Sequence, residues 1–420
     1  MLVIKNIHLI DPLNQRDEIT NIQINEEGIL HALGDFEINE KDEIIDGTNQ
    51  IACPGFVDIH VHFRDPGQTY KEDIESGSKA AIAGGYTHVV CMANTVPVID
   101  DLNLYQENQH KMDKMPLHVY QSAAISKKFA GQELTDMAAL KKAGVRLFTD
   151  DGLPLKDGNF VRKAMINAAE LNVPLSFHEE DPRYIGKAGI NDGKISAILG
   201  FKGASRDAEI EIIKRDLELA KATGATINIQ HISSKEAVQL VREAKQQGIH
   251  VHAEACPHHF TLTEDAVLQH GSLAKMNPPL REEADRLAII DGLKDGTIDI
   301  IATDHAPHSK EEKDKPLLAC PSGIIGLETA YALANEILVS QGYLTQVQLI
   351  EKMSVNPARL INIRAALDIG KEANMTIIDP NKQWIVQKFA SKSQNSPFFG
   401  RLCKGKVIAT IAKGKIVYHE

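Results

Sequence analysis

Eight apolar, β-rich runs alternate with helical patterns between Phe56 and about Leu360, and this alternation restricts the fold more than any other feature of the chain. The runs read FVDIHVHF, THVVCMAN, LHVYQSAA, GVRLFTDD, VPLSFHEE, TINIQHIS, IHVHAEACP and IDIIATDHAP. Amphipathic stretches such as ELTDMAALKKAG and RDAEIEIIKRDLELAKATG separate them. Strand–helix alternation is typical of parallel βα units in an α/β protein, and eight units predict a closed (β/α)8 barrel similar to a TIM barrel.

The two ends of the chain have a different, all-β character. Short strand-like runs with turns between them fill both ends, for example LVIKNIHLI near the start and GKVIATIA near the end. Because chain termini often lie close together in space, we expect both ends to form one small β-sandwich beside the barrel. The predicted limits are 1–52 for the first part of this sandwich, 53–365 for the barrel and 366–420 for the second part.

Charge and composition exclude several classes of function. The 420 residues are 43% hydrophobic and 25% charged, which is ordinary for a globular protein. The net charge of −11 predicts a surface that repels phosphate backbones and anionic lipids, so we expect no nucleic-acid partner. No run approaches the roughly 18 apolar residues of a membrane span, and the start lacks a signal-peptide pattern. The expected location is the cytoplasm, without a membrane partner.

Metal-binding or polar side chains follow most of the predicted strands, and active sites of such barrels lie at these carboxyl ends. Side chains alternate along a strand, so His60 and His62 at the end of the first run point to the same side. Imidazoles and carboxylates resist burial unless they are paired or bound to metal, so packing alone does not explain such a rim. The other strand ends carry Asn94, Asp150, Asp151, His178, His231, Asp304 and His305.

The histidines and aspartates at the strand ends are called metal-type side chains here. They outnumber the ligands of one ion, because a catalytic zinc takes three or four protein ligands. Two metals with a shared carboxylate are the economical interpretation. Imidazole and carboxylate suit Zn²⁺ best, with Mn²⁺ or Co²⁺ as substitutes. The candidate ligands are His60, His62, Asp151, His178, His231 and Asp304.

Several motifs together resemble the dihydroorotases of the long bacterial type, a family of cyclic amidohydrolases. They read FVDIHVHFRDPG, CMANT, FTDDG, HEE, QHIS, NPPLR, ATDHAPH and GIIGLE, and the similarity extends from about Ile51 to Arg364. The combination of HFRDPG with ATDHAPH is its most specific part. The resemblance implies reversible hydrolysis of (S)-dihydroorotate to N-carbamoyl-L-aspartate in pyrimidine biosynthesis, by a hydroxide that bridges two metals.

The resemblance also implies a role for each ligand. The first metal takes His60, His62 and Asp304, and the second takes His178 and His231. Many cyclic amidohydrolases bridge the metals with a carboxylated lysine on strand four, but GVRLFTDDG contains no lysine. Asp151 is then the implied bridge, and Asp150 is the competing candidate. Asp304 is the implied catalytic acid and base.

Substrate recognition is expected to depend on charge, because dihydroorotate carries a carboxylate. Arg64 offers a planar fork of donors for this group. The resemblance implies that Asn94 and His308 supply further hydrogen-bond donors. It also implies that Asn277 binds the ring amide and that Ser322 and Gly323 contact the substrate through their backbone groups. The complete predicted set of substrate-binding residues is His62, Arg64, Asn94, Asn277, His308, Ser322 and Gly323.

Two alternative functions stay open. One is a hydantoinase- or allantoinase-like enzyme, whose substrates lack this carboxylate. The other is a metal-poor scaffold without catalysis. The expected partners are a second copy of the chain in a homodimer and an aspartate carbamoyltransferase.

Three further features complete the interpretation. We expect residues 309–322 to form a lid, in which the charged run from Lys310 to Lys315 stays solvated and Leu317-Leu318 close over the substrate. We expect structural roles for His250, His252 and Glu254, which alternate along the seventh predicted strand. We expect the same for the adjacent pair His258 and His259, which follows that strand.

Overall fold

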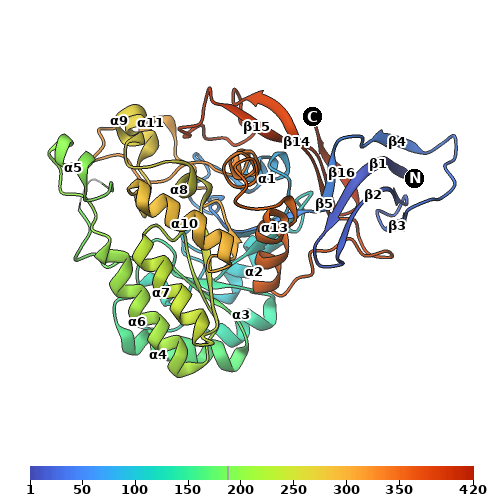
Figure 1. Ribbon diagram of the computed structural model, residues 1–420. Coiled ribbons are helices and arrows are strands. Elements are labelled where there is room, and N and C mark those ends of the chain that lie inside the picture. Colours follow the sequence, from blue (N-terminus) through green and yellow to red (C-terminus); the bar gives the residue numbers. More distant parts are fainter. Residues whose placement is uncertain (187–188) are drawn as a thin grey trace.

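The computed structural model describes residues 1–186 and 189–420, and it contains a barrel of parallel strands beside a sheet built from both chain ends (Figure 1). In Figure 1 the blue strands of the N-terminal end lie next to the red strands of the C-terminal end. Helices from the middle of the chain surround the barrel. This arrangement places the predicted strand ends of the barrel at one rim.

Both chain ends contribute strands to one eight-stranded sheet with the order β16-β15-β14-β5-β1-β2-β3, in which β4 pairs with β1. β14 is antiparallel to β5, with Met375 opposite Pro54, and apolar side chains such as Ile7 and Ile377 share one buried cluster. The predicted pairing of the chain ends is therefore confirmed. The strands are β1 (Leu2–Asp11), β2 (Arg16–Ile24), β3 (Leu30–Leu33), β4 (Glu43–Asp46), β5 (Ile51–Pro54), β14 (Met375–Ile385), β15 (Leu402–Ala412) and β16 (Lys415–His419).

Each of the eight predicted apolar runs contains one strand of the barrel. Parallel pairing joins β6 to β8 in one group and β9 to β13 in another. Parallel bridges between Ala123 and Phe148 and between Val61 and His305 connect the two groups at both edges, so the strands form a closed ring. The strands are β6 (Phe56–Val61), β7 (Tyr86–Cys91), β8 (His118–Gln121), β9 (Phe148–Thr149), β10 (Leu175–Phe177), β11 (Ile227–Ile229), β12 (Val251–Ala255) and β13 (Ile300–Ile301).

Helices connect the strands and begin where polar side chains cap their free N–H groups. Asp73 accepts a hydrogen bond from the Ser76 N–H at the start of α1, and Ser234 accepts one from the Ala237 N–H at the start of α7. The helices are α1 (Ile74–Ala83), α2 (Leu102–Met112), α3 (Met137–Ala143), α4 (Gly158–Leu171), α5 (Lys194–Leu199), α6 (Asp207–Thr223), α7 (Lys235–Gln246), α8 (Pro257–Thr261), α9 (Ala266–His270), α10 (Glu283–Asp295), α11 (Lys310–Lys313), α12 (Ala330–Ala334), α13 (Gln346–Ile350) and α14 (Asn356–Leu360).

Short helical turns of other types complete the helical layer. A π-helical turn, Asn335–Val339, continues α12, and another, Glu351–Val355, joins α13 to α14. Lys127–Phe129 and Gly271–Ala274 form 3-10 turns. Among the helices in the described residues, none has the length and apolar character needed to cross a membrane.

Backbone hydrogen bonds fix the strand ends of β6, β7 and β13 relative to one another. The N–H of His62 donates to the carbonyl of His305, and the N–H of Met92 donates to the carbonyl of Val61, both at 2.9 Å. Carboxyl ends of neighbouring parallel strands lie at the same edge. Side chains far apart in the sequence therefore meet at this rim.

We expect Gly55→Ala to destabilise the junction between the terminal sheet and the barrel. Gly55 lies between β5 and β6, and a Cβ there would lie 2.1 Å from Oγ1 of Thr87 in β7. Overpacking of this kind costs about 1–3 kcal/mol, which urea denaturation will measure as a lower free energy of unfolding.

Gly158→Ala is the matched control for this substitution. At the start of α4, the nearest atom to an added Cβ is Cδ of Arg215 at 3.6 Å. Alanine should be neutral or slightly stabilising there, because it favours the helix. Equal stability of the Gly55→Ala variant and the wild type would contradict the proposed steric constraint.

Candidate metal centre and active site

His60 and His62 leave β6 on the same side and meet carboxylates from two other strands. Nε2 of His62 lies 3.1 Å from Oδ1 of Asp304 and 3.4 Å from Oδ2 of Asp151. Nε2 of His60 lies 3.4 Å from Oδ1 of Asp151 and 3.6 Å from Oδ1 of Asp304. His60 is fully buried, and its Nε2 has no hydrogen-bond partner in the described part of the chain. A buried nitrogen that faces two carboxylates suits a cation.

Asp151 belongs to two groups of metal-type side chains at once. One group contains His60 and His62, the other contains His178 and His231, and in each the ligand atoms lie within 4.8 Å of one another. Nδ1 of His178 is 2.9 Å from Nε2 of His231 and 3.8 Å from Oδ1 of Asp151. Because a carboxylate has two oxygens, it can contact two ions. The geometry therefore suits a metal pair that shares Asp151.

The neighbouring Asp150 has its carboxylate directed elsewhere. It accepts hydrogen bonds from the N–H groups of Ile125 at 2.7 Å and Ser126 at 3.0 Å, and from the Ser126 hydroxyl. Burial raises the pKa of Asp150 to about 6 despite these bonds. Asp150 thus holds the segment after β8, and only Asp151 of the two faces the histidines.

Three of the predicted site residues have a left-handed backbone. The φ angles are 58° at Arg64, 31° at His231 and 47° at Asp304. This region is unfavourable for residues with a Cβ, and it persists only where the surrounding structure enforces it. The three residues lie shortly after β6, β11 and β13, and all three line the same cavity.

Burial and charges in the barrel centre favour the metal-binding forms of Asp151 and His231, whereas nearby carboxylates outweigh burial and raise the pKa values of His60 and His178. Burial opposes ionisation of Asp151, but the adjacent His60 imidazole holds the pKa of this carboxyl well below its usual range. Burial, together with the nearby His178, lowers the pKa of His231 well below its ordinary value. Metal ligands must be deprotonated carboxylates and neutral imidazoles. Asp151 and His231 therefore have the required protonation states.

Glu254 on β12 holds His60 in place, which gives the structural role expected for this residue a concrete form. Oε2 of this buried carboxylate is 2.9 Å from Nδ1 of His60, and Oε1 accepts a hydrogen bond from Nδ2 of Asn228. A carboxylate on the far nitrogen fixes the tautomer of an imidazole and the direction of its free nitrogen. The sequence indicates this position of Glu254 through the alternation of side chains along β12, which directs Glu254 into the barrel.

Two further acidic residues support the centre and were missed in the sequence analysis. Asp58 accepts hydrogen bonds from the N–H of His60 at 3.0 Å and from Oγ1 of Thr303 at 2.6 Å, which ties β6 to the end of β13. Glu180 lies 3.4 Å from Nε2 of His178. Asp58 precedes His60 by two residues, so the alternation of side chains along the strand places it on the same face as the HxH pair. Glu180 lies in a loop, where no regular alternation of side chains could have predicted its position.

A cavity of about 220 Å³ borders the centre and brings all the predicted substrate-binding residues together. His60 lies behind its wall, because this side chain is fully buried. The lining consists of His62, Arg64, Asn94, Asp151, Gly152, His178, His231, Asn277, Asp304, Ala306, His308, Ser322 and Gly323.

Arg64 and His308, which line one part of this cavity, donate hydrogen bonds to backbone carbonyls. Nε of Arg64 donates to the carbonyl of Pro307 at 3.3 Å, which leaves its other N–H donors for the cavity. Nε2 of His308 donates to the carbonyl of Ser322 at 2.8 Å. Burial and the nearby Arg64 lower the pKa of His308 to about 3, so its ring is neutral. The N–H of the His308 ring thus holds the backbone of Ser322 in position.

The two predicted amide side chains contact the metal-type residues directly. Oδ1 of Asn94 is 3.0 Å from Nδ1 of His62, and its Nδ2 donates to Oδ2 of Asp151 at 2.9 Å. Nδ2 of Asn277 donates to Oε2 of Glu180 at 3.1 Å. Asn94 therefore links metal-type side chains that follow β6 and β9, and Nδ2 of Asn277 lies 3.3 Å from Nε2 of His178.

The charged half of the segment 309–322 is not fully solvated, and that prediction is wrong. Lys310–Lys313 form α11, and the ammonium of Lys313 is buried and donates to the carbonyls of Pro321 and Gly323. Nζ of Lys71 pairs with Glu312 at 3.0 Å. An ammonium has three donors, so carbonyls that satisfy them make its burial tolerable.

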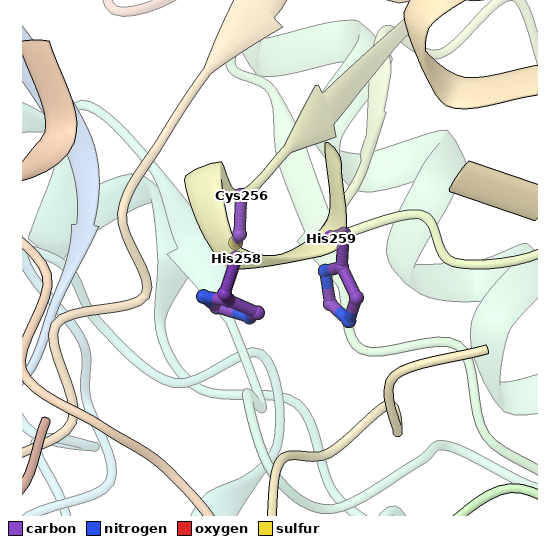
Figure 2. A group of neighbouring side chains, drawn as sticks. All are labelled: Cys256, His258 and His259. Atoms are coloured by element: carbon purple, nitrogen blue, oxygen red, sulfur yellow. The ribbon is translucent and has the colours of Figure 1, made fainter. Parts of the chain in front are cut away.

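Cys256, His258 and His259 form a third buried group of metal-type side chains, at the start of α8 (Figure 2). Nε2 of His259 lies 3.0 Å from the carbonyl of Pro278. This contact holds the backbone next to Asn277. The expected structural role of His259 thus has a concrete form, support of the loop that carries Asn277.

Solved structures with the same fold include hydantoinases (dihydropyrimidinases). The L-hydantoinase (dihydropyrimidinase) of Arthrobacter aurescens has a TM-score of 0.87 and 23% sequence identity, and the comparison covers 100% of this chain and 96% of that one. The D-hydantoinase (dihydropyrimidinase) of Thermus sp. has a TM-score of 0.85 and 24% identity, with 100% and 95% covered. These likenesses confirm the predicted fold class.

Sequence relatives identify the family of the chain. The family model described as Dihydro-orotase-like matches residues 49–237. The dihydroorotase of Clostridioides difficile is 55% identical and that of Clostridium acetobutylicum is 48% identical, and each comparison covers 100% of both chains. The chain belongs to the dihydroorotase family, as its motifs indicated.

We expect Asp151→Ala to remove metal and Asp150→Ala to remove stability. Asp151→Ala eliminates the carboxylate shared by both groups, so mass spectrometric metal analysis should show a lower metal content in a folded chain. Asp150→Ala is the matched control and should keep its metal while unfolding more easily, by about 1–3 kcal/mol for a backbone donor left unsatisfied. An unchanged metal content in the Asp151→Ala variant would contradict the assignment.

Proposed function

We propose that this chain catalyses the reversible hydrolysis of the ring amide of (S)-dihydroorotate, which opens the ring to N-carbamoyl-L-aspartate in pyrimidine biosynthesis. The observation that carries the proposal is one cavity that combines a cluster of metal-type side chains with the guanidinium of Arg64. The cluster supplies hydrolytic chemistry, and the guanidinium suits the carboxylate that distinguishes dihydroorotate from hydantoin-type rings. The dihydroorotase relatives support this assignment.

We further propose two Zn²⁺ per chain, for which Mn²⁺ or Co²⁺ can substitute. His60, His62 and Asp304 would hold one ion, His178 and His231 the other, and Asp151 both. Two observations fit such a pair of ions. Nε2 of His60 is buried and has no hydrogen-bond partner among the described residues, and Asp151 belongs to both groups of metal-type side chains. When bound, the metals supply Lewis acidity, which acidifies a water and polarises a carbonyl group.

Asp304 is the residue that we propose to move the proton. Its side chain is 13% exposed, whereas that of Asp151 is 4% exposed, so Asp304 is the more accessible carboxylate. Oδ1 of Asp304 faces His62, which leaves Oδ2 for a water molecule. Asp304 accepts a proton as the water oxygen bonds to the ring carbonyl carbon, and it returns the proton to the ring nitrogen as the C–N bond breaks.

The proposed substrate orientation follows from the two ends of the cavity. Arg64 binds the carboxylate, with the backbones of Ser322 and Gly323 beside it. Asn277 faces the ring amide. His62, Asn94 and His308 shape the floor and wall against which the ring lies, because all three line the cavity.

A turnover assay with metal analysis tests the proposal directly. Purified chain should hydrolyse dihydroorotate, and it should leave hydantoin almost untouched, because a neutral ring offers nothing to Arg64. Removal of metal with a chelator should stop turnover, and Zn²⁺ should restore it. Preferred hydrolysis of hydantoin would indicate the hydantoinase alternative, and a chain without metal or turnover would indicate the scaffold alternative.

Arg64→Met should weaken the use of dihydroorotate without changing the metal content. Loss of one partner from a largely desolvated charge pair costs about 2–5 kcal/mol. At about 1.4 kcal/mol per decade, this corresponds to one to three decades in kcat/KM.

Arg183→Met is the control for a lost arginine, because Arg183 is an exposed residue that pairs with Asp181. Its kcat/KM should equal that of the wild type. An equal loss on dihydroorotate and on a neutral cyclic amide in the Arg64→Met variant would show that Arg64 does not recognise the carboxylate.

Three broader expectations stay predictions. They are the domain limits at 1–52, 53–365 and 366–420, the cytoplasmic location, and assembly as a homodimer that associates with an aspartate carbamoyltransferase. Light scattering of the chain alone and mixed with that enzyme will measure both assemblies.

A further inference from the structure

A connection in the terminal sheet extends to the rim of the barrel. This segment, residues 386–401 between β14 and β15, is called the strap here. The buried carboxylate of Glu72 accepts hydrogen bonds from the Lys392 N–H at 3.1 Å and from the Ser391 hydroxyl. Oγ of Ser393 donates to the carbonyl of Lys71 at 2.7 Å. The strap is therefore docked on the loop between β6 and α1.

Asn395 extends from the strap into the wall of the proposed active site. Its side chain is buried, with 4% of the residue exposed. Nδ2 donates to the carbonyls of Ala306 at 3.0 Å and Gly323 at 3.1 Å. Oδ1 accepts a hydrogen bond from the N–H of His308 at 3.1 Å, and the Asn395 carbonyl accepts one from the N–H of Ile325 at 3.0 Å. Both donors and the acceptor of this amide are thus engaged.

The backbone groups that Asn395 binds are the two ends of one loop. Ala306 and His308 begin the loop after β13, Gly323 ends it, and all three line the cavity. Between the first two lies Pro307, whose carbonyl accepts the hydrogen bond from Nε of Arg64. The position of the guanidinium therefore depends on a backbone that Asn395 fixes on both sides.

We propose that Asn395 is a positioning residue for the carboxylate-binding side of the active site. The proposal rests on the proposed function. Asn395 holds the 306–308 backbone against Gly323, so that Arg64 and the backbone of Gly323 face the substrate carboxylate together. The terminal sheet thereby contributes to specificity through the strap, although its strands belong to a separate layer of the fold.

The chemistry of this position requires an amide. Two carbonyl oxygens need donors and one N–H needs an acceptor, and asparagine supplies both within the length of one short side chain. An aspartate of the same shape keeps the acceptor for His308 but places negative charge against the carbonyls of Ala306 and Gly323. A serine is too short to reach all three groups. Both substitutions should release the loop.

The test measures substrate use and ligand binding in Asn395→Asp and Asn395→Ser variants. We expect KM for dihydroorotate, and the Kd for orotate as an unreactive ring with a carboxylate, to rise about tenfold to a hundredfold, as expected for lost buried hydrogen bonds. We expect kcat to stay within about threefold and the metal content to be unchanged, because the described hydrogen bonds of the Asn395 side chain go to the backbones of Ala306, His308 and Gly323 and not to a proposed metal ligand. Asn395→Asp is nearly isosteric, so it keeps the test valid if the serine variant folds poorly.

Ser393→Ala is the matched control on the same strap. Ser393 is equally buried, but its hydroxyl binds Lys71, outside the cavity wall. This variant should lose thermal stability and keep KM and Kd. The proposal is overturned if the Asn395 variants keep wild-type KM and Kd, or if Ser393→Ala raises both values equally. A wild-type chain that does not hydrolyse dihydroorotate overturns the proposed function, and this inference with it.

Discussion

The carboxylate of Asp151 is the group on which the rest of the site depends. It lies between two pairs of histidines that come from different strands, and each of its oxygens faces one imidazole of the HxH pair. It is the member shared by the group that contains His60 and His62 and the group that contains His178 and His231. Burial of such a carboxylate is costly unless neighbouring charges compensate, and the surrounding imidazoles do so. The closed barrel is what brings these residues to one point.

Support for this centre comes from a second layer of buried polar groups. Glu254 orients His60, Asp58 ties β6 to the end of β13, and Asn94 links His62 to Asp151. Each contact connects two strands, so the ligand geometry is a property of the closed sheet. Buried polar groups stabilise a structure only when their partners are complete. These contacts hold the barrel rim, where the left-handed backbones at Arg64, His231 and Asp304 persist.

Loops and the terminal sheet supply the other half of the site. The 309–322 segment is anchored by the buried ammonium of Lys313, and the strap reaches the same wall through Asn395. In both cases a buried polar side chain donates hydrogen bonds to carbonyls of the loop. The metal-type side chains therefore lie on or shortly after regular strands, whereas other groups that line the cavity are held by contacts within the 309–322 loop and from the strap.

The sequence alone was sufficient to predict the eight barrel strands, the pairing of both ends and the family, because these follow from hydrophobic period, strand-end residues and local motifs. It also placed the predicted ligands at one rim, since the ends of parallel strands meet. Only the tertiary structure distinguished Asp151 from Asp150, because adjacent residues at a turn differ in side-chain direction and not in pattern. Glu254, Glu180 and Asn395 likewise act through partners far away in the chain, and no local period records a contact across more than 80 residues such as that between Asn395 and His308.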